Sequence, residues 1–179
     1  ADIVGLQEVT VPLLAQIQHH PNIQQKYILS GLAEKKKKKK ICGDYCVMPY
    51  GQLILSKLPI QKAEIKIFKG SGIKRMLACH VWQPDKIITE KSPEKLNSAA
   101  AKLIVINLHL QAGLEAGHTM ARVRQLHAVR EYANSKDHKN HPLVILGDFN
   151  FGDGDPEDIQ HNALDFHTSS SGGDDGDDG

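Results

Sequence analysis

The stretch LVILGDFN at residues 143–150 carries the clearest indication of fold in this 179-residue chain. Four consecutive apolar residues follow the turn-forming Pro142, and so short a run predicts a strand that is buried on both faces, as in parallel sheets. The strand ends in a glycine, an acid and an amide. Because ligands bind at the carboxyl ends of the strands in open α/β sheets, Asp148 and Asn150 are placed for chemistry. The alternative is that these two polar residues only form an Asx turn.

Length and composition predict one folded domain with an ordinary core. The chain is 40% hydrophobic and 24% charged, as in soluble globular proteins. No apolar run approaches the length of a membrane span, and no secretory signal is visible at the amino end, so we expect an intracellular protein of the cytoplasm or nucleus. The 3 cysteines lack C-x-x-C spacing, which argues against a disulfide framework and a zinc site and favours a reducing compartment.

Two charged blocks are hidden within the net charge of +1. Residues 35–40 are all lysine, and most of residues 174–178 are aspartate. Both blocks lie in low-complexity sequence that cannot bury apolar surface, so we expect solvated, mobile segments. The alternative for the lysine run is an electrostatic contact with a polyanion. The predicted organisation is a domain over residues 1–168, with a lysine-rich loop at 34–41 and a long polar loop at 83–102, and a disordered tail at 169–179.

Two further predicted strands also end in polar side chains. Residues 2–7 form a short apolar strand that ends at Glu8, and residues 103–108 form another that ends at His109. With the two-residue period of a strand, Asn107 and His109 point to the same face. A histidine at a strand end is, taken alone, as often a hydrogen-bonded structural residue as a catalyst.

The three strand ends together indicate a metal site. The carboxylates of Glu8 and Asp148 and the amide of Asn150 form an oxygen-rich set, which suits Mg²⁺ or Mn²⁺. In a phosphoryl-transfer site the metal neutralises developing charge and Asp148 orients or deprotonates a water molecule. His109 contacts the phosphate or protonates the leaving oxygen. We therefore predict that Glu8, His109, Asp148 and Asn150 converge around one cleft.

The rest of the chain predicts further strands and two helices. These are a helix from Thr10 to His19, strands at 26–30, 51–56, 60–68 and 75–82, and a helix from Thr119 to Asn134. The second helix links the strand at 103–108 to the strand at 143–146, which makes those two strands parallel. On this helix, Arg122 and Gln125 are most simply a solvated pair. Arg75, which begins a strand, is more often a surface ion-pair partner than a ligand group.

The motifs resemble the endonuclease/exonuclease/phosphatase superfamily, also called deoxyribonuclease-I-like. The matching segments run in family order and are residues 2–9, 50–60, Asn107-Leu108-His109-Leu110, Arg122-x-x-Gln125 and Gly147-Asp148-Phe149-Asn150. The resemblance implies an α/β fold, a four-layer α/β sandwich of two packed mixed β-sheets flanked by helices. It implies Mg²⁺ or Mn²⁺ at Glu8 and Asp148. The catalytic residues that it implies are His109, Asp148 and Asn150, and Arg75 and Asn107 are implied to bind substrate.

Within the superfamily, the chain looks most like the tyrosyl-DNA phosphodiesterase 2 (TDP2) branch and related nucleic-acid end-processing domains. The supporting residues are Gly117-His118, Gln125-Leu126 and the segment 74–81. This implies a phosphodiesterase with nucleic acid as its partner, in DNA repair or RNA processing. One alternative is a catalytically degenerate binding module. Another is a phospholipid or phosphoinositide phosphoesterase, for which we expect an exposed apolar lip, and the sequence shows none beyond Trp82.

The chain departs from the family pattern at both ends. Members normally have an Asn-bearing strand before the L-Q-E strand and a closing Ser-Asp-His segment, and neither is found. Asp165 and His167 follow Asn150 too closely to leave room for the intervening strands of the family sheet. We therefore expect a domain that lacks its terminal strands and retains most of the fold with little activity. No particular oligomeric state is predicted.

Overall fold

Two β-sheets packed face to face form the centre of the computed structural model, which describes residues 1–30, 47, 50–71, 74–82 and 102–151. The elements in chain order are β1 (Ile3–Thr10), α1 (Val11–His19), α2 (Pro21–Lys26), β2 (Ile28–Leu29), β3 (Tyr50–Ser56), β4 (Ile60–Ile67), β5 (Arg75–Trp82), β6 (Lys102–His109), α3 (Ala116–Ala133) and β7 (Leu143–Asp148). The first sheet has the strand order β1-β3-β2, and the second sheet has the order β4-β5-β6-β7. Neighbouring strands are antiparallel except β6 and β7, which are parallel because α3 carries the chain back across the sheet.

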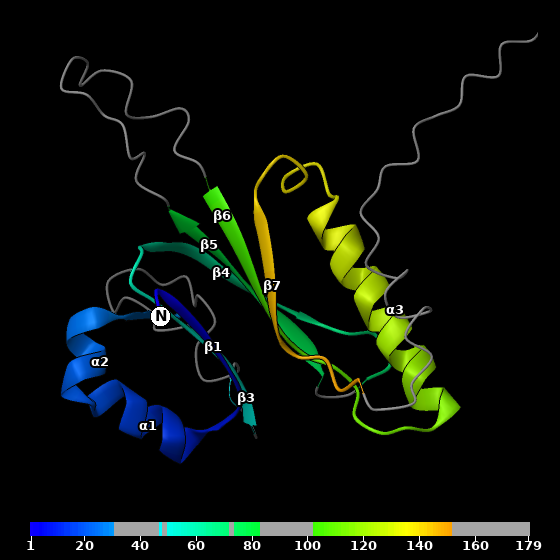
Figure 1. Cartoon of the computed structure of the whole chain (residues 1–179), viewed down its shortest axis with the longest axis horizontal. Helices are drawn as coiled ribbons and strands as arrows, with labels where there is room; N and C mark the ends of the chain where they lie inside the picture. The colour runs from blue at the N-terminus through cyan, green and yellow to red at the C-terminus, as the bar shows by residue number, and fades with distance from the viewer. Residues whose placement is uncertain (31–46, 48–49, 72–73, 83–101, 152–179) are drawn as a thin grey trace, which may run out of the picture.

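Helices cover the outer faces of both sheets (Figure 1). One apolar cluster, which includes Ile17 of α1 and Leu53 of β3, joins α1 and α2 to the first sheet. A second cluster, which includes Ile54 and Leu77, lies between the two sheets. A third cluster, which includes Leu126, joins α3 to the second sheet. The order of layers is therefore helix, sheet, sheet, helix, and the predicted four-layer α/β sandwich is confirmed.

Alternation along the strands explains how one sheet serves two clusters. On β5, Leu77 and Cys79 belong to the cluster between the sheets, whereas Met76 and Ala78 belong to the cluster under α3. Successive strand residues point to opposite faces, so a strand with apolar residues at every position is buried on both sides. The sequence of β5 therefore fits a central strand of a covered sheet.

A buried amide joins the two sheets. Asn107 of β6 is fully buried, and its Nδ2 donates hydrogen bonds to the carbonyl oxygens of Leu6 (2.9 Å) and Leu53 (3.2 Å). Its Oδ1 accepts a hydrogen bond from Gln7, and Gln52 Nε2 donates to its backbone oxygen at 3.1 Å. The side chain of Asn107 thus holds β1 and β3 against β6, and its predicted role in binding substrate stays a prediction.

Several predicted elements differ from the observed ones. The last strand is only partly buried, because β7 lies at the edge of the second sheet as described. Ile145 packs against the cluster under α3 and Leu146 against the cluster between the sheets, but Val144 is 44% exposed. The segment 26–30 contains the end of α2 followed by the short strand β2, and α3 begins at Ala116 instead of Thr119. None of the helices described is both long enough and apolar enough to cross a bilayer.

The predicted loops and tail lie almost wholly outside the described residues. This applies to the lysine-rich loop at 34–41, to the tail at 169–179 and to the loop at 83–102 up to residue 101. Trp82 and Lys102 lie at the ends of β5 and β6 on either side of that last segment.

Gly147 allows β7 to approach β6 closely. Its φ is +133°, and a Cβ added there would lie 2.1 Å from the carbonyl oxygen of Leu108 and 2.6 Å from its nitrogen. Backbone atoms of a central strand cannot move aside as a flexible side chain can. The glycine of the 147–150 motif is therefore required by the packing of two backbones immediately before Asp148.

We expect Gly147→Ala to lower the free energy of unfolding by about 2–4 kcal/mol, because the new methyl group both clashes with β6 and strains a positive φ. Urea unfolding measures this change. Gly117→Ala is the matched control, since no atom lies within 4 Å of an added Cβ in α3. That substitution should be neutral or stabilise the protein by up to about 1 kcal/mol. Equal effects at the two positions would contradict the packing argument.

Candidate active site

Three of the predicted site residues meet at one end of the two sheets. His109 and Asp148 are paired in the parallel register of β6 and β7. His109 Nε2 lies 3.9 Å from Glu8 Oε1 and 3.9 Å from Asp148 Oδ2. The His109 side chain is only 9% exposed, whereas those of Glu8 and Asp148 are 71% and 51% exposed. The result is a pair of solvent-facing carboxylates over a buried imidazole.

A β-bulge turns Glu8 toward this site. The register of β1 on β3 runs from Leu6 opposite Leu53 to Val9 opposite Gly51, so β1 has one extra residue. Without the bulge, Glu8 would share a face with Leu6, which packs in the cluster under α1. At the bulge Glu8 adopts a φ of +54°, an unfavourable conformation for this residue type. The same bulge that strains the backbone of Glu8 therefore directs its carboxylate toward His109.

The turn after β7 fixes Asp148 and Asn150 relative to each other. The backbone N–H of Asn150 donates to Asp148 Oδ1 at 2.9 Å, and Asn150 Nδ2 donates to the carbonyl oxygen of Leu110 at 2.9 Å. Asn150 has a φ of +52°. The Asx turn, which was the alternative prediction for Asp148 and Asn150, is therefore present. It holds Asp148 so that Oδ2 faces His109. Asn150 Oδ1 has no hydrogen-bond partner among the described residues.

Basic side chains share a small cavity with His109. A small cavity is lined by Tyr50, Gly51, Gln52, Lys74, Arg75 and His109. Arg75 is 8% exposed, and its guanidinium donates to the Tyr50 carbonyl oxygen at 3.1 Å. Gln52 Oε1 is buried without a hydrogen-bond partner among the residues described. The predicted substrate contact at Arg75 thus lines the same cavity as His109, and its role stays a prediction.

Lys74 is the residue that sequence reasoning missed. Burial lowers its pKa, while the negative charges of Asp148 and Glu8 oppose that change. Its side chain lines the cavity next to His109, within electrostatic range of the two carboxylates. Its position directly before Arg75, at the start of β5, was the only signal in the sequence, and that signal is not specific.

Burial and a neighbouring positive charge keep the His109 ring neutral near neutral pH in the free protein. Burial is the main cause of its lowered pKa, and Lys74 lowers it further, against the opposing effects of Asp148 and Glu8. A neutral imidazole keeps one N–H, which donates a hydrogen bond, but it lacks the second proton that an imidazolium ion releases as an acid. In this state His109 is better suited to contact a phosphate oxygen than to protonate a leaving group.

Arg122 and Gln125 of α3 hold the loop that follows β6. Arg122 is fully buried, and its Nη1 donates to the carbonyl oxygens of Gln111 (3.1 Å) and Gly113 (2.7 Å). Gln125 Oε1 accepts a hydrogen bond from the Gln111 backbone N–H at 2.9 Å. The interpretation of these two residues as a solvated pair is wrong, since both are buried and shape the backbone just beyond His109.

The donor set at this end of the sheets suits a hard cation. Glu8 and Asp148 offer carboxylate oxygens and Asn150 offers an amide oxygen, and the two carboxylates are open to solvent. Mg²⁺ and Mn²⁺ are commonly held by one or two carboxylates together with water and phosphate oxygens. The residues therefore fit such an ion.

Comparison with known proteins supports the α/β-sandwich fold described above. A model of the endonuclease/exonuclease/phosphatase family matches residues 1–177. Similar solved structures include truncated TDP2 from Caenorhabditis elegans, with 20% identity, a TM-score of 0.54, and coverage of 85% of this chain and 50% of that chain. Sphingomyelinase C from Streptomyces griseocarneus has 20% identity, a TM-score of 0.60 and coverage of 92% and 57%. Among curated proteins, no sequence matches the chain.

A third similar structure contains metal. A double mutant of beta toxin from Staphylococcus aureus with bound magnesium ions has 18% identity, a TM-score of 0.59, and coverage of 91% of this chain and 57% of that chain. The chain thus spans between 50% and 57% of the lengths of these three structures. At such identities the likeness establishes the fold and leaves the activity to be argued from the site.

We expect Glu8→Gly to be more stable than Glu8→Ala by about 1 kcal/mol, because both remove the carboxylate but only glycine adopts a left-handed φ without strain. Urea unfolding of the two variants measures the difference. The control pair is Lys66→Gly and Lys66→Ala, at an exposed position in the regularly paired part of β4. There the order should reverse, since glycine weakens a regular strand. If the alanine variant is the more stable one at both positions, Glu8 is not strained.

We expect the pKa of His109 in metal-free protein to lie below its ordinary value of 6.5. Lys74→Met removes a neighbouring positive charge and should raise this pKa, whereas Glu8→Gln removes a negative charge and should lower it. NMR titration of the His109 ring measures both changes. Lys26→Met, at the end of α2, is the control and should leave the value unchanged. A pKa above 6.5 in the unaltered protein would contradict the burial argument.

Proposed function

The chain belongs to the endonuclease/exonuclease/phosphatase family, and we propose that it is a divalent-metal-dependent phosphodiesterase that acts at nucleic-acid ends. The observation that carries this proposal is the approach of Glu8 and Asp148 to His109, each 3.9 Å from its Nε2, with Lys74 in the cavity next to His109. Carboxylates that hold a cation, together with a buried imidazole and an ammonium group, match the charges of a phosphodiester and its developing negative charge.

Each residue has a distinct task in the proposed mechanism. Glu8 and Asp148 would hold Mg²⁺ or Mn²⁺, which when bound stabilises charge on the phosphate and makes a water molecule more acidic. Asp148 Oδ2 orients or deprotonates the attacking water, and Asn150 Oδ1 accepts a hydrogen bond from the same water. The neutral ring of His109 donates a hydrogen bond to a non-bridging phosphate oxygen. Its burial keeps this donor in place before the substrate arrives.

The basic side chains favour a polyanionic substrate. Lys74 and Arg75 line the cavity next to His109, and the lysines at 35–40 add a further block of positive charge to the chain. Adjacent phosphates of a nucleic acid strand would pair with these cations, whereas a lone phosphomonoester would use only one. The resemblance to the TDP2 branch is consistent with this choice, and TDP2 is among the proteins of similar structure.

A phospholipid headgroup is the second candidate substrate. The structural match to sphingomyelinase C covers 92% of this chain. Leu114 and Phe151 are 70% and 39% exposed. They lie in the segments that follow β6 and β7, the two strands that carry His109 and Asp148. A lipid surface requires exposed apolar groups near the site, so these two side chains are the specific observation that favours it.

The test is hydrolysis by the full-length protein in Mg²⁺, with 5′-phosphotyrosyl DNA, abasic DNA, RNA ends and sphingomyelin vesicles as substrates. We expect turnover of a nucleic-acid end that EDTA abolishes. Asp148→Asn should lower kcat/KM by about 10²–10⁴-fold, because it removes a catalytic base. The control is Glu131→Gln on the exposed side of α3, which should leave kcat/KM unchanged.

The other outcomes separate the alternatives. Turnover of sphingomyelin alone would favour the lipid substrate, and replacement of Leu114 and Phe151 by serine should then weaken vesicle binding. Nucleic-acid binding without turnover of any substrate would favour the degenerate binding module. An activity that survives both EDTA and Asp148→Asn would overturn the proposed mechanism.

A further inference from the structure

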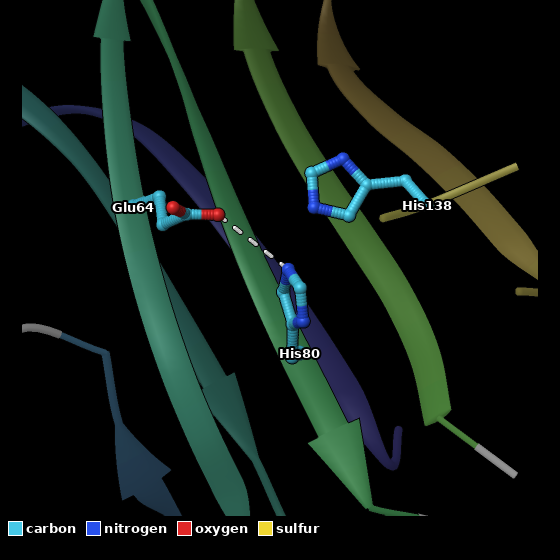
Figure 2. A group of neighbouring side chains, drawn as sticks. All are labelled: Glu64, His80 and His138. Atoms are coloured by element: carbon cyan, nitrogen blue, oxygen red, sulfur yellow. Dashed lines mark ion pairs between the residues drawn. The ribbon is translucent and has the colours of Figure 1, made fainter. Parts of the chain in front are cut away.

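A second group of ligand-type side chains lies on the opposite face of the second sheet. Glu64 of β4, His80 of β5 and His138, from the connection between α3 and β7, each offer one ligand atom, and these atoms all lie within 4.8 Å of one another. Figure 2 shows the carboxylate and the two rings pointing toward a common space. Glu64 is paired with Ala78, which packs under α3, so this face is not the one that carries His109.

Hydrogen bonds orient the ring of His138. Its Nδ1 lies 2.9 Å from the carbonyl oxygen of Tyr132 and 2.8 Å from Ser135 Oγ. A carbonyl oxygen only accepts hydrogen bonds, so Nδ1 carries the proton in the neutral ring, and Nε2 keeps its lone pair. Among the described residues, Nε2 of His138 makes no hydrogen bond. This is the arrangement found around metal-binding histidines, in which a carbonyl group fixes the tautomer and leaves the other nitrogen for the metal.

The carboxylate of Glu64 is also held in place by its neighbours. Lys62 Nζ lies 2.7 Å from Oε1, and the hydroxyl group of Tyr132 donates to Oε2 at 2.7 Å. Burial alone would raise the pKa of Glu64, but the hydrogen bonds from Lys62 and Tyr132 outweigh it and lower the pKa, so the carboxylate is ionised. Oε2 faces His80 Nε2 at 3.5 Å. Glu64 thus presents one charged oxygen to the two rings.

We propose that Glu64, His80 and His138 form a binding site for a transition-metal ion of the Zn²⁺ type. Two imidazole nitrogens and one carboxylate oxygen suit Zn²⁺, Co²⁺ or Ni²⁺, whereas Mg²⁺ prefers oxygen ligands alone. Both rings are largely buried, with His80 at 8% and His138 at 9% exposure, so the ion is shielded while Glu64 remains partly open to solvent. The ligand atoms need to close toward one ion by about 1 Å, given metal–ligand distances of roughly 2.0–2.2 Å.

A metal here would join three segments that are distant in the sequence. β4 and β5 are neighbours in the second sheet, and His138 lies in the connection that leads from α3 into β7. The ion would therefore fasten this connection to the sheet, a few residues before the strand that carries Asp148. Binding to the folded state alone stabilises a protein by mass action, so the site is expected to raise Tm.

The test is titration of the 179-residue chain with Zn²⁺ by calorimetry and with Co²⁺ by visible absorption, in excess Mg²⁺ to occupy oxygen-donor sites. We expect binding of Zn²⁺, a d–d spectrum of Co²⁺ with nitrogen ligands, and a rise in Tm of about 5 °C when Zn²⁺ is a hundredfold above its Kd. Glu64→Gln and His138→Gln should each weaken Zn²⁺ binding by about a hundredfold or more.

Glu8→Gln is the matched control, because it alters the candidate active site and leaves this cluster intact. Its Zn²⁺ affinity should equal that of the unaltered chain. Glu64→Gln retains an acceptor for Tyr132 and is the variant that should fold even where His138→Gln does not, which circular dichroism checks. No Zn²⁺ binding in the unaltered chain would overturn the proposal, as would binding that Glu64→Gln leaves unchanged or that Glu8→Gln abolishes.

Discussion

The candidate site depends on the hydrogen bonds by which one buried side chain, Asn107, joins the two sheets. Its Nδ2 bonds the carbonyl oxygens of Leu6 on β1 and Leu53 on β3. With an apolar residue there, the relative position of the two sheets would depend on side-chain packing alone, because hydrophobic contact is not directional. Leaving these buried carbonyl groups without a donor would also cost about 1–3 kcal/mol each. The amide therefore fixes where β1 lies over β6, and so where Glu8 lies over His109.

Within that frame, unusual backbone conformations aim the functional groups. Glu8 and Asn150 are the positive-φ residues other than glycine in the described chain, and Gly147 comes immediately before Asp148. Each of them lies beside a carboxylate of the candidate site or carries one. Strain of this kind persists only where surrounding structure over-determines it, and here the surrounding structure is the sandwich held by Asn107. Stability in the core and strain at its edge are thus parts of one arrangement.

Local sequence predicted the strand ends but not the contacts between distant segments. Glu8, His109 and Asp148 could be found because each follows an apolar run, and such runs report burial without reference to the rest of the chain. The structural role of Asn107 could not be predicted, since only the stacking of two sheets shows that its amide is buried between them. Lys74 and the grouping of Glu64 with His138 depend on strand register and on a loop path, which single-sequence patterns do not encode. Val144 was misjudged for the same reason, because position within a sheet is a property of the topology.

The two faces of the second sheet carry different chemistry because strand residues alternate. His109 and its carboxylate partners lie on the side of β6 that faces the first sheet, while His80 and Glu64 lie on the side that faces α3. The donors also differ, since one group presents mainly exposed oxygens and the other presents two buried imidazoles. If both proposed sites bind metal, hard and borderline cations would therefore prefer different places on the same sheet. The groups remain mechanically connected, because the segment that carries His138 continues directly into β7, and β7 positions Asp148 against His109.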